Sequence, residues 1–352
     1  MTHASTSRLL SLDGMRGLAA IAVIAWHLEF IGAFAQSGYL AVDFFFVMSG
    51  VVIARAYRQR LHNGLPTFDF FAERVIRLYP LYLLGLLIGL TRLTGQIVAG
   101  HPNSLSWSEL GISAAFNLLM LPTPATTFLA PINIPSWSLF FELLVNVFWA
   151  AVLLRASRRV LIAAVVFLYA ALSLAVMDAG SAQGGWIWSE FHVGLLRSLF
   201  GFLLGVLMAQ TIDASPPRKS WWTLVAAAAL CALLAADVPQ PYRPLFDLGV
   251  ILVASPAIVW VGMRFDPPAC CEAAARALGD MSFPVYVLHF GPLFSISFLA
   301  RKLDISPALW IPSFVLGICA VSLYLARTYD PWARGKLKRL LAGRRLRMTW
   351  VA

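Results

Sequence analysis

The chain has 352 residues, of which 60% are hydrophobic and only 12% are charged. Its mean hydropathy is +0.76, whereas about a quarter of the residues in an ordinary soluble domain are charged. This composition excludes a soluble globular domain and predicts an all-α polytopic integral membrane protein. The formal net charge of +10 falls mainly in short loops and in a basic tail, so anionic lipids and membrane topology explain it better than nucleic acid does.

Ten apolar stretches are long enough to cross a hydrocarbon core of about 30 Å. With about ten spans both termini lie on one side, where most lysines and arginines also fall, and the positive-inside rule assigns that side to the cytoplasm. The predicted spans are Gly14–Gly32, Leu40–Tyr57, Val75–Leu93, Trp137–Leu154, Val160–Met177, His192–Gln210, Ser220–Ala236, Leu245–Gly262, Ser282–Ala300 and Ala308–Ala326. The basic residues expected outside are Arg92, Arg197, Arg243, Arg301 and Lys302.

We expect a single membrane-embedded domain over residues 1–352, in which 327–352 form a basic cytoplasmic tail. The longest loop, Thr94 to Ser136, is expected outside and holds an apolar piece, Leu110 to Leu121, that is too short to span the membrane. This loop could cover an acceptor site or simply cap the bundle. The four cysteines indicate no disulfide framework, and no cluster with metal-ligand spacing occurs in the sequence.

Arg16 and His27 lie near the two ends of the first predicted span, eleven residues apart. At about 100° per residue they share one face of a helix, roughly 16 Å apart along its axis. A cation and an imidazole within the membrane are costly unless each has a partner or water, so they mark a functional path by default. The alternative is an interfacial arginine and a histidine that bonds to a neighbouring helix.

Helix depth places two carboxylates near this histidine. At 1.5 Å per residue, His27, Asp43 and Glu142 all fall in the outer half of the membrane. An imidazole with a carboxylate in reach can act as a general base and take a proton from a hydroxyl. Asp43 could also be an ordinary charge at a helix end, whereas Glu142 is deeper and lies among apolar residues.

The inner side carries a different chemistry. Arg74 and Arg77 lie on one helix face at the start of the third predicted span, at the depth where Arg16 begins the first. Three guanidinium groups at one depth can bind phosphates, although ordinary positive-inside anchoring is the alternative. A binding site for an anionic donor at the inner face and a general base in the outer half together predict a group transfer through the helix bundle.

Six motifs in this order resemble the membrane acyltransferase-3 family over nearly the whole chain. They are LDGMRGLAAIAVIAWH, YLAVDFFFVMSG, RVIRLYP, PSWSLFFE, MSFPVYVLHF and TYDPWARGKLKR. The residues on family motif positions are Arg16, His27, Asp43, Arg74, Arg77, Trp137, Ser138, Glu142, Tyr286 and His289. Asp330 stands where we expect a glutamate.

The resemblance implies an O-acyltransferase of the bacterial inner membrane that modifies polysaccharides or related acceptors. The donor would be cytoplasmic acyl-coenzyme A, with acetyl as the expected group, and no metal is required. The acceptor would be a carbohydrate or glycoconjugate hydroxyl at the outer half of the membrane. No esterase-like domain follows the last motif, so the chain would act as a single-domain enzyme or together with a separate periplasmic partner.

The expected roles follow from the motif positions. The catalytic residues are His27, supported by Glu142 or Asp43, and the donor site is Arg16, Arg74 and Arg77. The substrate path is Trp137, Ser138, Tyr286 and His289. Direct transfer and an acyl-enzyme intermediate both remain open.

Two other classes of protein stay open. A proton-coupled exporter or flippase of a sugar or lipid-linked substrate would also keep histidine and carboxylates in mid-membrane, but it should have paired inverted segments. A non-catalytic assembly subunit would not require Arg16, His27 and Glu142 together. Release of coenzyme A on adding donor and acceptor separates the enzyme from both alternatives.

Overall fold

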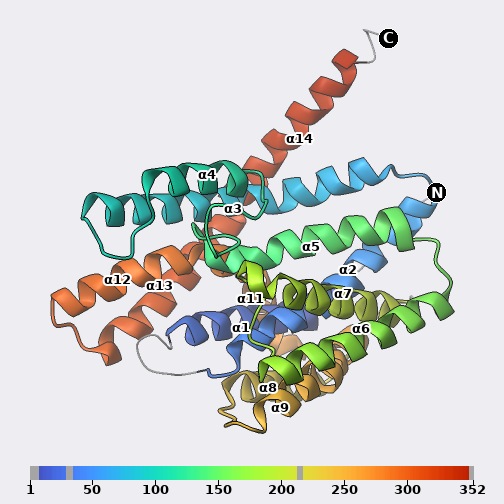
Figure 1. The fold of residues 1–352 in the computed structure, drawn as a ribbon. Helices are drawn as coiled ribbons and strands as arrows, with labels where there is room; N and C mark the ends of the chain where they lie inside the picture. Colours follow the sequence, from blue (N-terminus) through green and yellow to red (C-terminus); the bar gives the residue numbers. More distant parts are fainter. Residues whose placement is uncertain (1–7, 29–34, 212–216, 349–352) are drawn as a thin grey trace.

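A computed structural model describes residues 8–28, 35–211 and 217–348, with the side chains described as far as residue 340 (Figure 1). The helices are α1 (Leu10–His27), α2 (Ala41–His62), α3 (Thr67–Val98), α4 (Trp107–Leu118), α5 (Trp137–Phe148), α6 (Arg158–Ala179), α7 (Phe191–Ala209), α8 (Trp222–Ala235), α9 (Arg243–Gly249), α10 (Ser255–Arg264), α11 (Glu272–Leu288), α12 (Phe290–Lys302), α13 (Pro307–Arg327) and α14 (Tyr329–Met348). Short 3-10 turns are η2 (Gly38–Leu40), η3 (Ile134–Ser136), η5 (Trp188–Glu190) and η7 (Ala269–Cys271), and η4 (Trp149–Leu153) and η6 (Val250–Ala254) are π-helical. The two-residue strands β1 (Arg218–Lys219) and β2 (Phe265–Asp266) pair in parallel.

Among the described residues, seven helices are long and apolar enough to cross a membrane, or eight if one bent pair counts as a single span. This confirms an all-α, multi-pass membrane protein. The predicted spans Gly14–Gly32 and Ser220–Ala236 correspond to α1 and α8, which have 18 and 14 residues, and the end of the first lies outside the described residues. The count of ten spans and the sides of the termini stay predictions.

The predicted span Ser282–Ala300 is not one straight helix. It is the bent pair, in which α11 and α12 meet at 69° with His289 between them. The cause is Pro292, which has no N–H to donate to the carbonyl of Leu288 and whose ring collides with that carbonyl in a straight helix. The bend therefore places a histidine at a break in the bundle.

Helices α1 and α11 pack side by side in the centre of the bundle (Figure 1). They run parallel, because Gly14 meets Ala275 and Gly17 meets Leu278. A Cβ atom added at Gly17 would lie 2.4 Å from the carbonyl oxygen of Leu278, so only glycine permits this approach. Small residues are the usual means of close packing between membrane helices.

We expect Gly17→Ala to destabilise the protein, because the new methyl group meets a backbone atom that cannot turn aside. Overpacking of this kind costs about 1 to 3 kcal/mol, which a thermal midpoint in detergent would detect. Gly95→Ala is the matched control, since a Cβ at Gly95 meets nothing within 4 Å. Equal midpoints for both variants would contradict the tight contact of α1 with α11.

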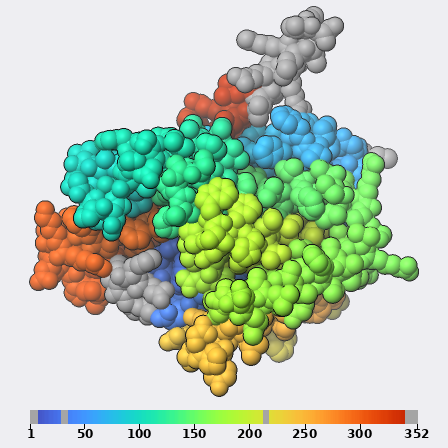
Figure 2. Space-filling model, in the orientation of Figure 1, coloured from blue at the N-terminus to red at the C-terminus, as the bar shows by residue number. Residues whose placement is uncertain are grey.

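The predicted apolar piece Leu110–Leu121 corresponds to the helix α4, which lies over α3 (Figure 2). It begins with a capping box between Ser106 and Glu109 and has 12 residues, too few to cross the membrane. The Tyr79 hydroxyl of α3 donates to the carbonyl of Leu118 at 3.1 Å. The helix thus covers the bundle, and its role as a lid stays a prediction.

Candidate active site

Three cavities follow one another through the bundle, and neighbouring cavities share lining residues. We call them the arginine cavity (about 400 Å³), the middle cavity (about 130 Å³) and the histidine chamber (about 510 Å³). The arginine and middle cavities share Arg16, Met48, Val52, Arg77, Phe283 and Arg334. The middle cavity and the histidine chamber share Val42 and Tyr286.

His27 lies at the end of α1, lines the histidine chamber and faces His289. The Nδ1 atom of His289 lies 2.9 Å from the carbonyl of Val285, which can only accept, so the Nε2 atom of His289 carries the lone pair. That Nε2 lies 3.2 Å from Nδ1 of His27, and the carbonyl of Val23 lies 2.8 Å from the same Nδ1. His27 therefore holds its proton on Nδ1, and its Nε2 carries a free lone pair.

Aromatic rings make up most of the chamber wall around this imidazole. The ring of Trp26 packs edge-on against His27 with the centroids 4.6 Å apart, and Phe290 does so at 5.2 Å. The other aromatic lining residues are Tyr39, Phe128, Trp137, Trp186, Tyr286 and Phe294. Such a wall suits a ligand with apolar faces and gives the histidine few competing polar neighbours.

Tyr286 and Ser138 form the boundary between the middle cavity and the histidine chamber. Their hydroxyl oxygens lie 2.7 Å apart, and Tyr286 donates to the carbonyl of Pro135 at 2.9 Å. Both side chains are buried. Their hydrogen bonds hold the Tyr286 side chain, which lines both cavities, in place.

The middle cavity holds an ion pair between α3 and α5. The Arg74 Nη2 atom donates to Oε1 of Glu142 at 2.7 Å, and the Ser49 hydroxyl donates to the same oxygen at 3.2 Å. Arg74 is 5% exposed, and its Nε atom is buried without a partner. The middle cavity therefore holds an arginine whose charge is balanced by Glu142 and whose Nε–H has no acceptor among the described residues.

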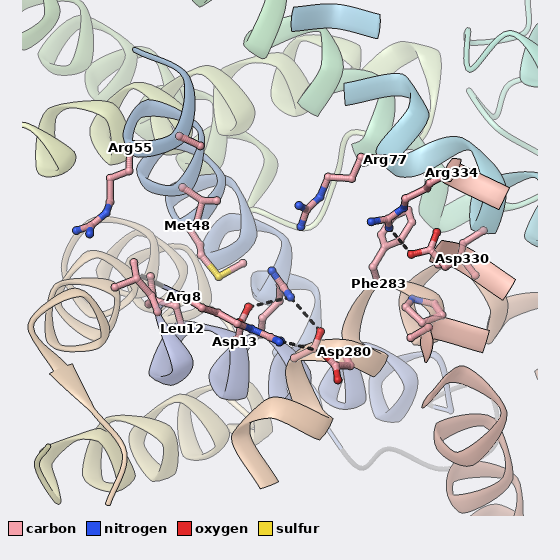
Figure 3. A pocket seen from close by; sticks show the side chains of 18 residues that line it. Arg8, Leu12, Asp13, Met48, Arg55, Arg77, Asp280, Phe283, Asp330 and Arg334 are labelled. Atoms are coloured by element: carbon pink, nitrogen blue, oxygen red, sulfur yellow. Dashed lines mark hydrogen bonds and ion pairs between the residues drawn. The ribbon is translucent and has the colours of Figure 1, made fainter. Parts of the chain in front are cut away.

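The arginine cavity gathers cations from several helices (Figure 3). Arg16 donates to Ser282 Oγ at 2.7 Å and to the carbonyl of Gly279 at 2.9 Å, and it pairs with Asp13 at 3.0 Å. Within the described part of the chain, Arg55 and Arg77 form no ion pair. The cavity thus keeps uncompensated positive charge, which suits an anionic ligand.

A buried ion pair closes the far side of the histidine chamber. Arg197 of α7 binds Asp43 of α2 through two bonds, of 2.9 and 2.6 Å, and donates to the carbonyls of Gly184 at 2.7 Å and Tyr39 at 3.2 Å. Both charged side chains are almost completely buried. The pair therefore ties the loop between α6 and α7, which carries Trp186 into the chamber, to the start of α2.

A second buried carboxylate holds the same loop. Asp247 of α9 accepts hydrogen bonds from the hydroxyls of Tyr39 and Ser181 and from the backbone N–H of Ala182. The carboxylates of Asp43 and Asp247 and the guanidinium of Arg197 thus hold the loop between α6 and α7, which forms this wall of the chamber.

Comparison with known proteins identifies the class. A family model described as an acyltransferase domain matches residues 9–327. The chain belongs to the acyltransferase-3 family. This confirms the predictions of that family and of an O-acyltransferase.

Curated relatives of this acyltransferase differ in how much of their length it matches. Acyltransferase MdmB of Streptomyces mycarofaciens is 27% identical over 80% of this chain and 78% of that protein. Protein 2 in picA locus of Rhizobium radiobacter is 38% identical over 45% of this chain and 90% of that protein. Peptidoglycan O-acetyltransferase OatA of Listeria monocytogenes is 26% identical over 88% of this chain but only 53% of that protein. No solved structure matches significantly.

Eight of the ten predicted site residues line the three cavities, and Asp43 and His289 line none of them. Arg16, Arg74 and Arg77 all line the middle cavity, and Arg16 and Arg77 also line the arginine cavity. His27, Trp137 and Tyr286 line the histidine chamber, and Ser138 and Glu142 line the middle cavity. Their assignment to catalysis and binding stays a prediction.

The structure pairs these residues differently from the sequence-based expectation. The direct partner of His27 is His289, whereas Glu142 and Asp43 bind Arg74 and Arg197. Counted from Ser282, where the predicted span begins, His289 would lie nearer the inner face than His27, but α11 begins at Glu272 and the two rings are in contact. Arg197, the partner of Asp43, was expected only among the outer basic residues. Its position as a cation within an apolar segment was the feature that could have marked it as a buried functional residue.

No group of three or more histidine, cysteine, aspartate or glutamate residues that could hold a metal ion occurs in the described ranges. The four cysteines, Cys231, Cys270, Cys271 and Cys319, are free thiols.

Proposed function

We propose that this acyltransferase moves a short acyl group, such as acetyl, from acyl-coenzyme A to a hydroxyl of a carbohydrate or glycoconjugate. The single observation that carries the proposal is the series of cavities from an arginine-lined opening to the free imidazole nitrogen of His27. The arginines suit the phosphates of the donor, and the aromatic chamber suits the faces of a sugar ring. The Listeria relative is a peptidoglycan O-acetyltransferase, which supports a carbohydrate acceptor.

His27 would act as the general base. In direct transfer, its Nε2 takes the proton of the acceptor hydroxyl while the oxygen attacks the thioester carbonyl. The carbon–sulfur bond then breaks, and the thiolate takes the proton back as coenzyme A. In the acyl-enzyme alternative, Nε2 itself attacks the carbonyl and expels the coenzyme A thiolate. The acceptor hydroxyl then attacks the acyl-imidazole, its proton passes to the thiolate, and the imidazole is released. His289 accepts a hydrogen bond from His27 Nδ1 and so keeps the proton of the resting imidazole on Nδ1, which leaves Nε2 free to react in either scheme.

The other charged residues would support this reaction from a distance. Arg16 and Arg77 would bind donor phosphates, and Arg74 with Glu142 would line the path of the pantetheine arm. Tyr286 and Ser138 stand where that arm must pass. Asp43 would hold the chamber wall through Arg197. A separate periplasmic partner is a further proposal.

We further propose that the chain lies in the bacterial inner membrane, with ten spans and both termini in the cytoplasm. The donor would then enter from the cytoplasm and the acceptor from the outer side. The concentration of basic residues on one side supports this orientation.

Two measurements test the orientation. In a variant without native cysteines, Asn103→Cys in the loop before α4 should react with an impermeant thiol reagent from outside, and Lys336→Cys in α14 should not. In sealed right-side-out vesicles, acylation and coenzyme A release should require the thioester inside, because the charged donor cannot cross about 30 Å of hydrocarbon. Full activity with donor supplied only outside would overturn transfer across the membrane, and no coenzyme A release under any loading would favour the exporter.

A further inference from the structure

Arg334 brings a second cation to the place where the arginine and middle cavities meet. Like Arg77, it lines both cavities, and Figure 3 shows the two guanidinium groups side by side at one end of the arginine cavity. Arg334 belongs to α14, whereas the family match ends at residue 327. This part of the cavity wall is therefore supplied by α14, which carries the last of the six motifs, TYDPWARGKLKR.

The helix that carries Arg334 is docked firmly enough to hold a side chain in place. It packs against α3 and α13, and the Tyr329 hydroxyl donates to the carbonyl of Pro80 at 3.4 Å. Asp330, one turn before Arg334, is buried and forms an ion pair with it. Arg334 is thus held at the cavity wall, where its side chain is 30% exposed.

At this point one carboxylate, that of Asp330, faces two guanidinium groups. Asp330 is the ion-pair partner of Arg334, and Arg77 has none among the described residues. The Nε atom of Arg334 is buried and makes no hydrogen bond in the described structure. Two neighbouring guanidinium groups with free donors repel each other unless an anion lies between them, and planar guanidinium donors match phosphate oxygens bidentately.

We propose that Arg77 and Arg334 form a clamp for a phosphate or pyrophosphate group of the acyl donor, and that Asp330 orients Arg334. The proposal rests on the proposed function for the identity of the donor, although the phosphate chemistry follows from the clamp itself. It makes α14 part of the binding site and not only a basic tail. The ligand class is a nucleotide-containing thioester whose phosphates enter first and whose acyl end points to His27.

Equilibrium binding to the full-length protein in detergent tests the clamp, because both faces are then accessible. The probes are coenzyme A, inorganic pyrophosphate and uncharged pantetheine. We expect Arg334→Ala to raise the Kd for coenzyme A by about 10- to 100-fold, as for a lost bond to a charged group, and to leave pantetheine binding unchanged. The Kd of Arg334→Lys for coenzyme A should lie between those of the wild type and Arg334→Ala, because lysine keeps the charge but cannot donate two parallel hydrogen bonds to a phosphate. The matched control is Arg339→Ala, an exposed arginine of the same helix.

The outcomes separate the clamp from the donor assignment. Unchanged coenzyme A affinity in Arg334→Ala, with normal binding to the wild type, overturns the clamp and leaves the proposed function standing. If the wild type binds pyrophosphate through Arg334 but not coenzyme A, the clamp stands and the donor assignment fails. Equal losses for coenzyme A and pantetheine mean that Arg334 holds the fold, and failure of the wild type to bind either phosphate probe overturns the clamp.

Discussion

Replacing His27 with alanine should lower the rate of acyl transfer by about 10²- to 10⁴-fold, the usual loss when a general base is removed. The physical reason is that Nε2 of His27 carries the free lone pair in the histidine chamber. The variant should still insert and purify at normal levels. Coenzyme A release, measured with donor and acceptor both in excess, reports the loss as a change in kcat.

The neighbouring histidine and a distant one give the controls for this experiment. His289→Gln should keep more activity than His289→Ala, because a side-chain carbonyl can still accept the proton of His27 Nδ1. His192→Ala removes an exposed histidine at the start of α7 and should change nothing. Near-normal acylation by His27→Ala would remove the residue from the chemistry.

The hydropathy of the sequence predicted most of the membrane helices but not the residues at which they begin. The third predicted span starts at Val75 because the apolar run does, yet α3 begins at Thr67, and a capped helix continues beyond the hydrocarbon at little cost. Arg74 therefore lies within a helix and reaches Glu142 at the middle of the bundle. The same effect in α11 brings His289 level with His27.

The choice of ion-pair partners could not be read from the sequence. Arg74, Arg77 and Arg197 are chemically alike, and which carboxylate each reaches depends on how the helices are rotated in the bundle. The motifs indicated that His27, Asp43 and Glu142 matter but gave no distances between them. Pairing needs the three-dimensional packing, in which close contacts such as Gly17 with Leu278 set the register.

Breaking the buried pair of Asp43 and Arg197 should have the largest effect on stability. Removing one partner leaves an unpaired charge in a buried site, which costs about 3 to 5 kcal/mol. We therefore expect Arg197→Met to lower the free energy of unfolding in detergent by about this amount. Arg158→Met removes an exposed cation at the start of α6 and should leave it unchanged.

The double variant Asp43→Leu with Arg197→Met separates stability from function. Replacing both charges with apolar side chains should restore much of the stability, since such replacements are often neutral. It should not restore the chamber wall, because the carbonyls of Gly184 and Tyr39 still lack their donor. We therefore expect a folded protein with a raised KM for the acceptor and an unchanged KM for the donor. A loss of kcat alone would mean that Asp43 takes part in the chemistry as the sequence-based prediction has it, and an equal rise in both KM values would contradict a role confined to the chamber wall.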